Sequence, residues 1–568
     1  MQHMKKTTVT REPAARASRG EERTGKAGAA VGSGKSPRVA LIHPPAISKR
    51  YMKTKFMPYG MAVLYSFLKE HSVDVIQYDF LMEYLFAARN DINYHDPEKT
   101  FSEQDFFSFL GGTGRHKGLA KFTEKYGDRL VRDAGIYAFS IVAYHQLWAA
   151  LLLSAHIRRF NPEAVIVFGG AFITIKPPES FVKYGGADYW IKGSGEIPLL
   201  RLHELVQGND EISKEQIPGL IYLNGKDIRR NPQATLPAEQ ERPPDFEGLP
   251  LDMYRYDHPL TGEQTLFLPY RVSKGCTSMC SFCTGRLVDK YDGKSVDKIV
   301  SEVTALARKY HTNNFQFADA SINGNPRRLA ELCDRLCSDF PEIRWYSYAK
   351  VNGFSADLLQ KVKDAGCFAL FWGVESAHQP TINLLGKRFK LSRMHELLDA
   401  SETIGIKTYV HLIYNTPHES DGDVRSFIEL VDRYIKSHMV VFLPNRFLLE
   451  PQSLMFEQPS RYGLKEIRKV ETGVFEREQY TYEEIEGNDF NALEVRNEEH
   501  LKRLAFHLHW ISFQNLRHRV HGRPSSLIPP KLLAFSALLA ARSRMLERIH
   551  RAIVGWIESK TQSFSEQL

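Results

Sequence analysis

The sequence predicts an α/β protein, in which an N-terminal doubly wound Rossmann-like domain precedes a partial (β/α)6 barrel of the TIM type and a mainly helical C-terminal region. Two observations lead to this prediction. Short apolar strands alternate with amphipathic helices along two successive stretches of the chain, which is the pattern of parallel sheets covered by helices. A segment rich in proline and acidic residues, including Pro243-Pro244-Asp245, separates the two stretches.

Composition sets the domain boundaries. Residues 1–37 hold eight Lys or Arg against three Glu and almost no large apolar residues, so we expect a disordered basic tail. The remaining boundaries place the first α/β domain at 38–225, the linker at 226–262, the barrel at 263–450 and the helical C-terminal region at 451–568.

The first domain opens with a β-branched strand at 39–42, followed by apolar residues at helical spacing from Met61 to Leu68. The alternation continues with strands at 73–78, 136–143, 164–168 and 189–191 and a helix at 147–158. An aromatic and charged insertion between about 84 and 134 is expected to cap this domain.

The second stretch contains six strand-and-helix units. Amphipathic helices at 296–310 and 421–435 are examples, and the strands are expected to begin near Leu266, Asn314, Ile343, Phe368, Lys407 and Val440. Parallel barrels collect their chemistry at the C-terminal ends of the strands. A loop with three cysteines directly follows the first of these strands, so we expect the active site there.

Bulk properties exclude several classes. The longest apolar runs are far shorter than the roughly 18 to 20 residues that cross a bilayer, and the N-terminus lacks a secretory core, so we expect a cytoplasmic protein without a transmembrane segment. Much of the net charge of +8 lies in residues 1–37, so the rest of the chain is nearly neutral. We therefore expect no nucleic-acid partner. Six cysteines are too few for a disulfide scaffold in a chain of this length.

Cys276, Cys280 and Cys283 form a Cys-x-x-x-Cys-x-x-Cys loop. Three thiolates on a cubane of four irons leave one iron open to an external ligand, so this spacing suits a [4Fe-4S] cluster at a substrate site. Zinc is the alternative, but structural zinc sites usually bring a second Cys-x-x-Cys pair, which the sequence lacks. We interpret Cys333, Cys337 and Cys367 as buried apolar residues.

The segment Lys274-Gly-Cys-Thr-Ser-Met-Cys-Ser-Phe-Cys283 resembles the signature of the radical S-adenosylmethionine (radical SAM) superfamily. The resemblance covers residues 263–435 and implies a [4Fe-4S] cluster held by the three cysteines, with S-adenosylmethionine on the open iron and its adenine beside Phe282. It also implies an external electron donor such as a flavodoxin or ferredoxin, and cleavage of the cofactor to a 5'-deoxyadenosyl radical.

Strand ends within the resemblance supply further cofactor-binding residues. They are Asp319 after the second strand, Lys350 after the third, and Glu375 and Ser376 after the fourth, where Glu375 would meet the ribose. The turn Tyr414-Asn-Thr-Pro-His-Glu419 departs from the family pattern, and its Asn415 and His418 face either substrate or solvent.

The domain in front is similar to the cobalamin-binding domain of cobalamin-dependent radical SAM enzymes. The similarity lies in the arrangement and in loops that follow strands, where doubly wound sheets bind ligands. The residues implied to bind cobalamin are His43, Ser140, Gly169, Gly170, Gly193, Gly195 and Glu196. The Asp-x-His-x-x-Gly motif is absent, so no histidine ligand to cobalt is expected.

The resemblance implies a methyltransferase that methylates an unactivated carbon of a natural-product, peptide or lipid substrate through methylcobalamin and the 5'-deoxyadenosyl radical. A cyclase or rearrangement enzyme with the same cofactors is one alternative, and a non-catalytic metal-binding protein is another. The sequence identifies no catalytic acid or base. His500, His507, His509, His518 and His521 are expected on several faces of one helix, solvated or facing substrate, and a basic helix at 532–556 is expected to be a solvated face or to contact a membrane surface or an acidic peptide.

Overall fold

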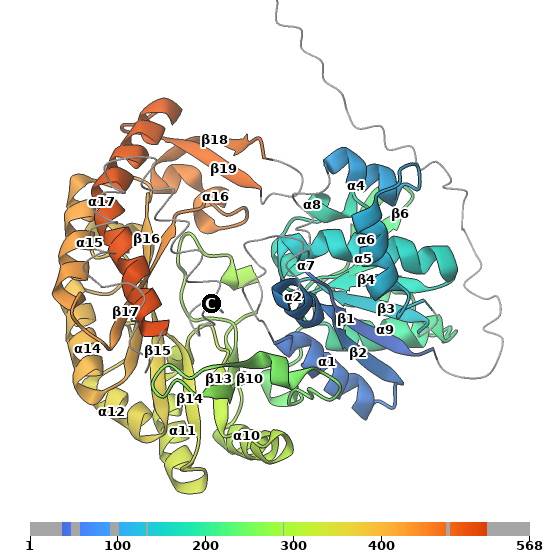
Figure 1. Ribbon diagram of the computed structural model, residues 1–568, viewed down its shortest axis with the longest axis horizontal. Coiled ribbons are helices and arrows are strands. Elements are labelled where there is room, and N and C mark those ends of the chain that lie inside the picture. The colour runs from blue at the N-terminus through green and yellow to red at the C-terminus, as the bar shows by residue number, and fades with distance from the viewer. Residues whose placement is uncertain are drawn as a thin grey trace, which may run out of the picture.

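The computed structural model describes residues 37–46, 57–90, 102–131, 134–287, 289–472 and 478–519. Two sheets, each with its own helices, lie beside one another (Figure 1). The expected α/β class with parallel sheets is confirmed. Residues 1–36 of the expected tail and the expected basic helix at 532–556 lie outside the described residues.

The first sheet has seven strands in the order β2-β1-β3-β4-β5-β6-β7. Its first five strands are parallel, and the last two pair antiparallel. The strands are β1 (Val39–His43), β2 (Val75–Asp79), β3 (Ile136–Ser140), β4 (Val165–Gly169), β5 (Tyr189–Ile191), β6 (Leu220–Asn224) and β7 (Asp227–Arg230). Because β7 pairs with β6, residues 227–230 belong to this sheet, although the sequence analysis assigned them to the linker.

Helices cover both faces of the first sheet. Apolar residues of α1 (Tyr59–Glu70) and α9 (Glu196–Val206) pack with Val39 and Leu41 of β1. The opposite face packs against α6 (Tyr144–Phe160), whose residues 146–154 are all buried. The remaining helices of this part are α2 (Phe80–Asn90), α4 (Glu103–Leu110), α5 (Lys117–Gly127), α7 (Ala171–Ile175) and α8 (Glu179–Val182). Helices α4 and α5, from the segment expected to cap the domain, pack on α6.

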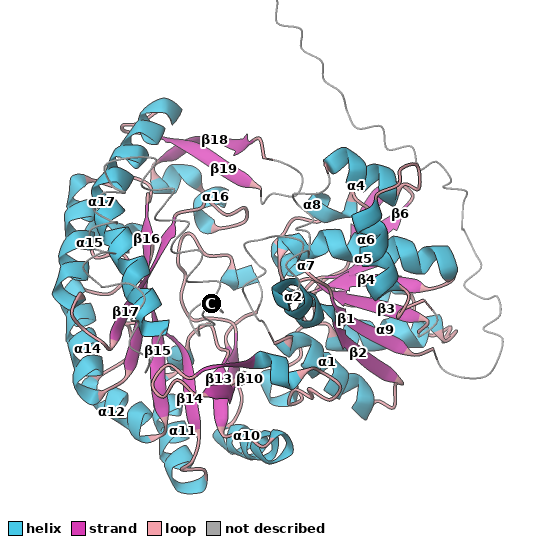
Figure 2. Ribbon diagram, in the orientation of Figure 1, coloured by secondary structure: helices cyan, strands magenta, loops and turns pink. Residues whose placement is uncertain are grey.

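The second sheet has six parallel strands in the order β10-β13-β14-β15-β16-β17. These are β10 (Leu268–Tyr270), β13 (Asn314–Phe317), β14 (Arg344–Ala349), β15 (Cys367–Glu375), β16 (Lys407–Tyr414) and β17 (Val440–Arg446). Figure 2 shows its helices along the outer side: α10 (Val296–Tyr310), α11 (Pro326–Asp339), α12 (Ala356–Asp364), α14 (Leu391–Ile404) and α15 (Asp421–Tyr434). The short α13 (Gln379–Leu384) follows β15.

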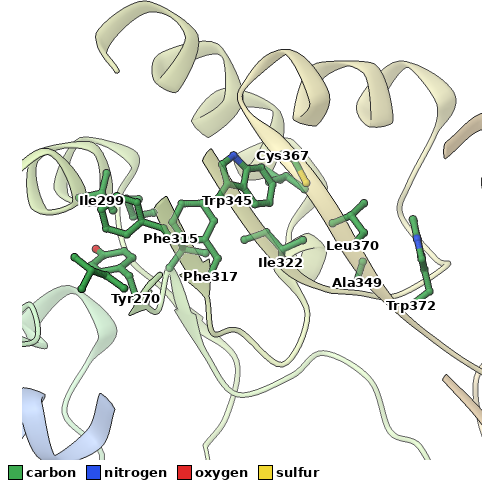
Figure 3. Close-up of a cluster of buried hydrophobic side chains, with 14 of the residues drawn as sticks. Tyr270, Ile299, Phe315, Phe317, Ile322, Trp345, Ala349, Cys367, Leu370 and Trp372 are labelled. Carbon is green, nitrogen blue, oxygen red and sulfur yellow. The ribbon is translucent and has the colours of Figure 1, made fainter. Parts of the chain in front are cut away.

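Large side chains fill the space between the second sheet and its helices. Trp345, Phe315 and Phe317 are fully buried there, as Figure 3 shows. Cys333 and Cys367 are buried in this core, as the sequence predicted, but Cys337 is exposed because it lies on the outer side of α11. Packing in the core is therefore a sufficient reason for Cys333 and Cys367, and neither needs a role as a metal ligand.

Two-stranded pairs connect and extend the sheets: β8 (Arg255–Asp257) with β9 (Gln264–Leu266), β11 (Ser273–Lys274) with β12 (Asp292–Gly293), and β18 (Leu464–Val470) with β19 (Gln479–Glu484). The β18-β19 hairpin interrupts a region expected to be mainly helical. The helices α16 (Leu454–Glu457) and α17 (Phe490–Arg519) complete that region, and α17 packs against α15. Within the described ranges, no helix has both the length and the apolar character needed to span a membrane.

Candidate active site

The cysteine loop begins directly after β11 and is held from several sides. Gly275 has φ +64°, and a Cβ there would lie 2.4 Å from a backbone carbonyl oxygen, so the turn requires glycine. The Ser281 N–H donates to Leu385 O at 3.1 Å, and its hydroxyl donates to Leu384 O at 2.9 Å. The Met455 N–H donates to Ser281 O at 2.9 Å. The loop is therefore fastened both to the segment after β15 and to the C-terminal region.

The three loop thiols are unpaired by disulfides. Cys276 and Cys280 are half-buried, and Cys283 is exposed. The Gly285 N–H donates to Cys283 Sγ at 3.2 Å, which favours a thiolate at that atom. Burial raises the pKa of the Cys280 thiol, while the positive charge of Lys387 opposes that shift. Binding to iron would deprotonate them, since metal ligation requires the thiolate.

Across the described ranges, no three His, Cys, Asp or Glu side chains lie close enough together to hold one metal ion. The separated thiols suit a [4Fe-4S] cluster because it distributes its thiolates over different irons. A structural zinc site instead gathers four ligands around one ion. The chemistry and placement of the three cysteines therefore fit a cluster with one open iron.

Glu375 ends β15 at a bulge and takes φ +69°, a conformation that non-glycine residues rarely adopt. Lys387 Nζ donates to Glu375 Oε1 at 2.8 Å and to the Gly373 carbonyl oxygen at 3.1 Å, and it lies 5.6 Å from the centre of the Phe282 ring. The described residues supply no donor to Glu375 Oε2. That oxygen remains available to a ligand hydroxyl, beside the ring that the sequence analysis placed near adenine.

The other predicted S-adenosylmethionine residues separate into two groups. Lys350 Nζ donates to the hydroxyl of Thr277 in the cysteine loop, so it joins Phe282 and Glu375 around that loop. Asp319 is buried and accepts the N–H groups of Val272 (3.1 Å) and Ser273 (2.6 Å). Its carboxylate therefore secures the chain that enters the loop. Ser376 Oγ accepts the His378 N–H at 3.0 Å, which fixes the turn after β15.

The face of the second sheet that is turned away from its helices adds residues that the sequence analysis did not identify. His411 lies opposite Gly373 in the register of β16 and β15, and its ring stacks on Tyr348 with centroids 5.8 Å apart. Its Nε2 is buried and has no hydrogen-bond partner in the described ranges. Burial lowers the pKa of His411, which favours the neutral ring. This places an unpaired imidazole nitrogen on the strand that neighbours Glu375.

The turn after β16 is covered by the C-terminal region rather than solvated. Asn415 is buried, and its N–H donates to Glu419 Oε1 at 2.6 Å. The His418 N–H donates to Glu484 Oε1 at 2.7 Å, and Arg496 Nη1 donates to the same oxygen at 2.8 Å. These bonds fix the turn and leave neither residue in an open solvated turn.

Two of the C-terminal histidines are paired with carboxylates. His500 Nδ1 lies 2.8 Å from Glu419 Oε2, and His507 Nε2 lies 3.2 Å from Asp432 Oδ1. These contacts dock α17 on the second sheet, which corrects the expectation of solvated or substrate-facing side chains. The side chains of His509 and His518, and His521 as a whole, lie outside the described residues.

A cavity of about 520 Å³ lies at the carboxyl ends of β1, β3, β4 and β5. All seven residues that the sequence analysis assigned to cobalamin line it: His43, Ser140, Gly169, Gly170, Gly193, Gly195 and Glu196. Apolar side chains such as Leu41, Leu64 and Leu199 form its deeper wall, and Arg271, Asp289 and Ala318 close it from the side of the second sheet. The cavity therefore adjoins the chain that enters the cysteine loop.

Several buried polar atoms on the cavity wall have no hydrogen-bond partner within the described part of the chain. They are His43 Nε2, Arg271 Nε and Asp289 Oδ1. Burial also raises the pKa of Glu196 in the same wall. Buried polar groups normally have hydrogen-bond partners. A ligand that carries both amide donors and amide acceptors would satisfy these atoms, and the amide side chains of a corrin ring are of this kind.

A buried charge cluster connects the two sheets beside this cavity. Glu241 is fully buried and contacts Tyr59 OH at 2.7 Å, Arg271 Nη2 at 2.9 Å and Lys274 Nζ at 3.1 Å. Tyr59 begins α1, whereas Arg271 and Lys274 flank the entry to the cysteine loop. The positive charges of Arg271, Lys294 and Lys274, together with the tyrosine hydroxyl, hold the pKa of Glu241 at about 2 despite its burial. This carboxylate fixes the first helix relative to the cysteine loop.

Residues 270–431 match the family model of the radical SAM superfamily. These residues are a radical SAM domain. The match includes the three cysteines together with Phe282, Lys350 and Glu375. The protein is a radical SAM enzyme, and the superfamily's cofactors are a [4Fe-4S] cluster and S-adenosylmethionine.

The chain also resembles individual proteins. An uncharacterized methyltransferase of Pyrococcus horikoshii is 25% identical over 406 residues, which cover 70% of this chain and 78% of the relative. The anaerobic magnesium-protoporphyrin IX monomethyl ester cyclase of Synechocystis sp. is 24% identical over 269 residues, 45% of this chain and 52% of the cyclase. The radical SAM methyltransferase TsrM from Kitasatospora setae, solved with cobalamin and a [4Fe-4S] cluster, has a similar fold: TM-score 0.54, 19% identity, 77% of this chain and 81% of TsrM.

Sequence reasoning missed four residues of the radical SAM domain and its cavity: Lys387, His411, Arg271 and Asp289. Lys387 had one signal, the preceding Gly386, which has φ +72° and lies so close to the cysteine loop that a Cβ there would be 3.0 Å from Met279 O. The alternation along β16 could have assigned His411 to the face opposite the helices. No sequence pattern around Arg271 or Asp289 indicates that these residues face the other sheet.

Proposed function

We propose that the protein is a cobalamin-dependent methyltransferase that methylates an unactivated carbon of a natural-product, peptide or lipid substrate. The observation that carries this proposal is the shared cavity. Seven residues at strand ends of the first sheet and three residues of the radical SAM domain line the same space. A methyl carrier bound there would lie beside the loop at which the radical is generated.

When bound, the cluster and S-adenosylmethionine supply a 5'-deoxyadenosyl radical, and cobalamin carries the methyl group. The residues of this chain position these groups. Lys387 and Gly386 hold Glu375 and Phe282 at the cysteine loop, and Glu241 fixes that loop to α1. The one electron needed for cleavage would come from a flavodoxin or ferredoxin, and the exposed Cys283 marks where the loop is accessible.

Product mass tests methyl transfer. Anaerobic, reduced protein supplied with S-adenosylmethionine and a candidate substrate should yield 5'-deoxyadenosine and a product heavier by one CH2. Methyl-deuterated S-adenosylmethionine should carry its label into that product. A product without the label would reject methyl transfer while leaving radical chemistry intact.

The second candidate is ring closure or rearrangement without methyl transfer. The observation in its favour is the match to the anaerobic ester cyclase over 269 residues. The same labelling experiment separates the two, because a cyclase would give 5'-deoxyadenosine and a product with no added methyl group. The longer match, over 406 residues, is to a methyltransferase, and this supports the first candidate.

A further inference from the structure

The cavity wall contains a histidine whose two ring nitrogens have different surroundings. His43 ends β1 and is fully buried. Its Nδ1 lies 3.1 Å from Asp79 Oδ1. Its Nε2 is buried and has no hydrogen-bond partner among the residues that the structure describes. Nδ1 therefore interacts with Asp79, whereas Nε2 is left for a hydrogen bond with a ligand.

Asp79 fixes which nitrogen carries the proton. Its Oδ1 also accepts the Met82 N–H at 3.2 Å, and its Oδ2 accepts the Tyr254 hydroxyl. Burial, followed by the charge of Asp79, raises the pKa of Tyr254, so the phenol keeps its proton and donates it. A carboxylate can only accept, so in the neutral imidazole His43 Nδ1 carries the hydrogen and Nε2 presents a lone pair.

The depth of the cavity indicates what Nε2 would meet. Leu41 lies two residues before His43 on the same face of β1, roughly 6 to 7 Å deeper. Leu64 of α1 and Leu199 of α9 line the same side of the cavity as Leu41. A flat apolar ring would fit against these leucines. A hydrogen-bond donor attached to that ring would then lie next to His43.

We propose that His43, oriented by Asp79 and Tyr254, accepts a hydrogen bond from the nucleotide portion of a complete corrinoid and thereby selects cobalamin over cobinamide, which lacks the nucleotide. The nucleotide has both required parts, an apolar dimethylbenzimidazole ring and a ribose that carries hydroxyl donors. This proposal rests on the proposed cobalamin-binding function. It assigns His43 to nucleotide recognition and leaves cobalt without a histidine ligand.

Binding of each corrinoid to cobalamin-free full-length protein tests this assignment. Aquocobalamin and diaquocobinamide are titrated anaerobically, and binding is followed by quenching of tryptophan fluorescence. His43→Phe keeps a ring of similar size but removes the acceptor, so we expect roughly ten-fold weaker cobalamin binding and unchanged cobinamide binding. Asp79→Asn no longer fixes the tautomer and should weaken cobalamin binding in the same direction by a smaller factor. Asp74→Asn, at an exposed partner of Arg38, is the control and should change neither.

The outcomes separate this proposal from the one on which it rests. If the wild-type protein binds neither corrinoid, cobalamin binding itself is rejected. If the wild type binds cobalamin but His43→Phe weakens both corrinoids equally, or neither, recognition of the nucleotide by His43 is overturned. Thermal unfolding of each variant shows whether the fold is retained, and if His43→Phe does not fold, the selective loss must appear in Asp79→Asn for the proposal to stand.

Discussion

Replacing Glu241 by glutamine should destabilise the protein strongly and in a pH-dependent way. The carboxylate is fully buried between Tyr59, Arg271 and Lys274, and its pKa is held at about 2 against an ordinary value of 4.5. A difference of this size corresponds to stabilisation on the order of 3 kcal/mol at pH 7. The variant would lose this stabilisation and leave the two basic side chains without their buried partner.

The direction of the pH dependence follows from the sign of the shift. Because the folded-state pKa is below the unfolded one, the wild type has the full stabilisation above pH 4.5 and loses it as the pH falls toward 2. Urea unfolding of metal-free protein is measured from pH 7 to pH 3. The difference in unfolding free energy between wild type and Glu241→Gln should narrow below pH 4.5.

Glu239→Gln is the matched control. Glu239 lies two residues away, is exposed, and hydrogen-bonds only to Ser295 among the described residues. The substitution should therefore lower the free energy of unfolding by less than about 1 kcal/mol. A gap between wild type and Glu241→Gln that is below about 1 kcal/mol at pH 7, or that stays constant down to pH 3, would refute the reasoning.

Three further predictions concern the radical SAM domain. Cys276→Ala should lose cluster iron and 5'-deoxyadenosine formation, measured by iron analysis and chromatography, whereas Cys337→Ala, an exposed cysteine on α11, should lose neither. Lys387→Met should leave Glu375 as a half-buried carboxylate without its ionic partner and lower the local stability of β15, measured by hydrogen exchange, by roughly 3 kcal/mol, and adding Glu375→Gln should largely restore it. Arg496→Met should likewise expose α17 to early proteolysis by removing the arginine that pairs with buried Glu484, and an unchanged cleavage pattern would contradict this.

The parts of the fold that sequence could predict are those encoded locally. The strands of the second sheet begin within about two residues of the expected positions, because each is an apolar run and all but β10 follow an amphipathic helix. The cysteine loop was equally predictable, since its ligands lie within eight residues of one another. The β18-β19 hairpin was missed because its strands are largely exposed and carry charged residues such as Lys465 and Glu466.

The site contacts that escaped prediction join residues distant in the chain. His43 was predicted as a site residue, but its hydrogen-bonded series with Asp79 of β2 and Tyr254 of the segment before β8 has no local pattern. Asp319 was correctly placed at a strand end, but its hydrogen bonds to Val272 and Ser273 of the neighbouring segment, which secure the chain entering the loop, have no local sequence signal. Position along a strand was therefore predictable, whereas the use of each side chain was not.

Metal analysis of protein purified anaerobically tests the central claim most directly. The proposed function predicts iron equivalent to one [4Fe-4S] cluster and one cobalt per chain, with a corrinoid visible spectrum. Cys276→Ala should lose the iron and keep the cobalt, because the thiols and the cavity are separate sites. Iron without cobalt, after the protein has been offered cobalamin, would contradict the methyl-transfer account and leave a radical SAM enzyme of another kind.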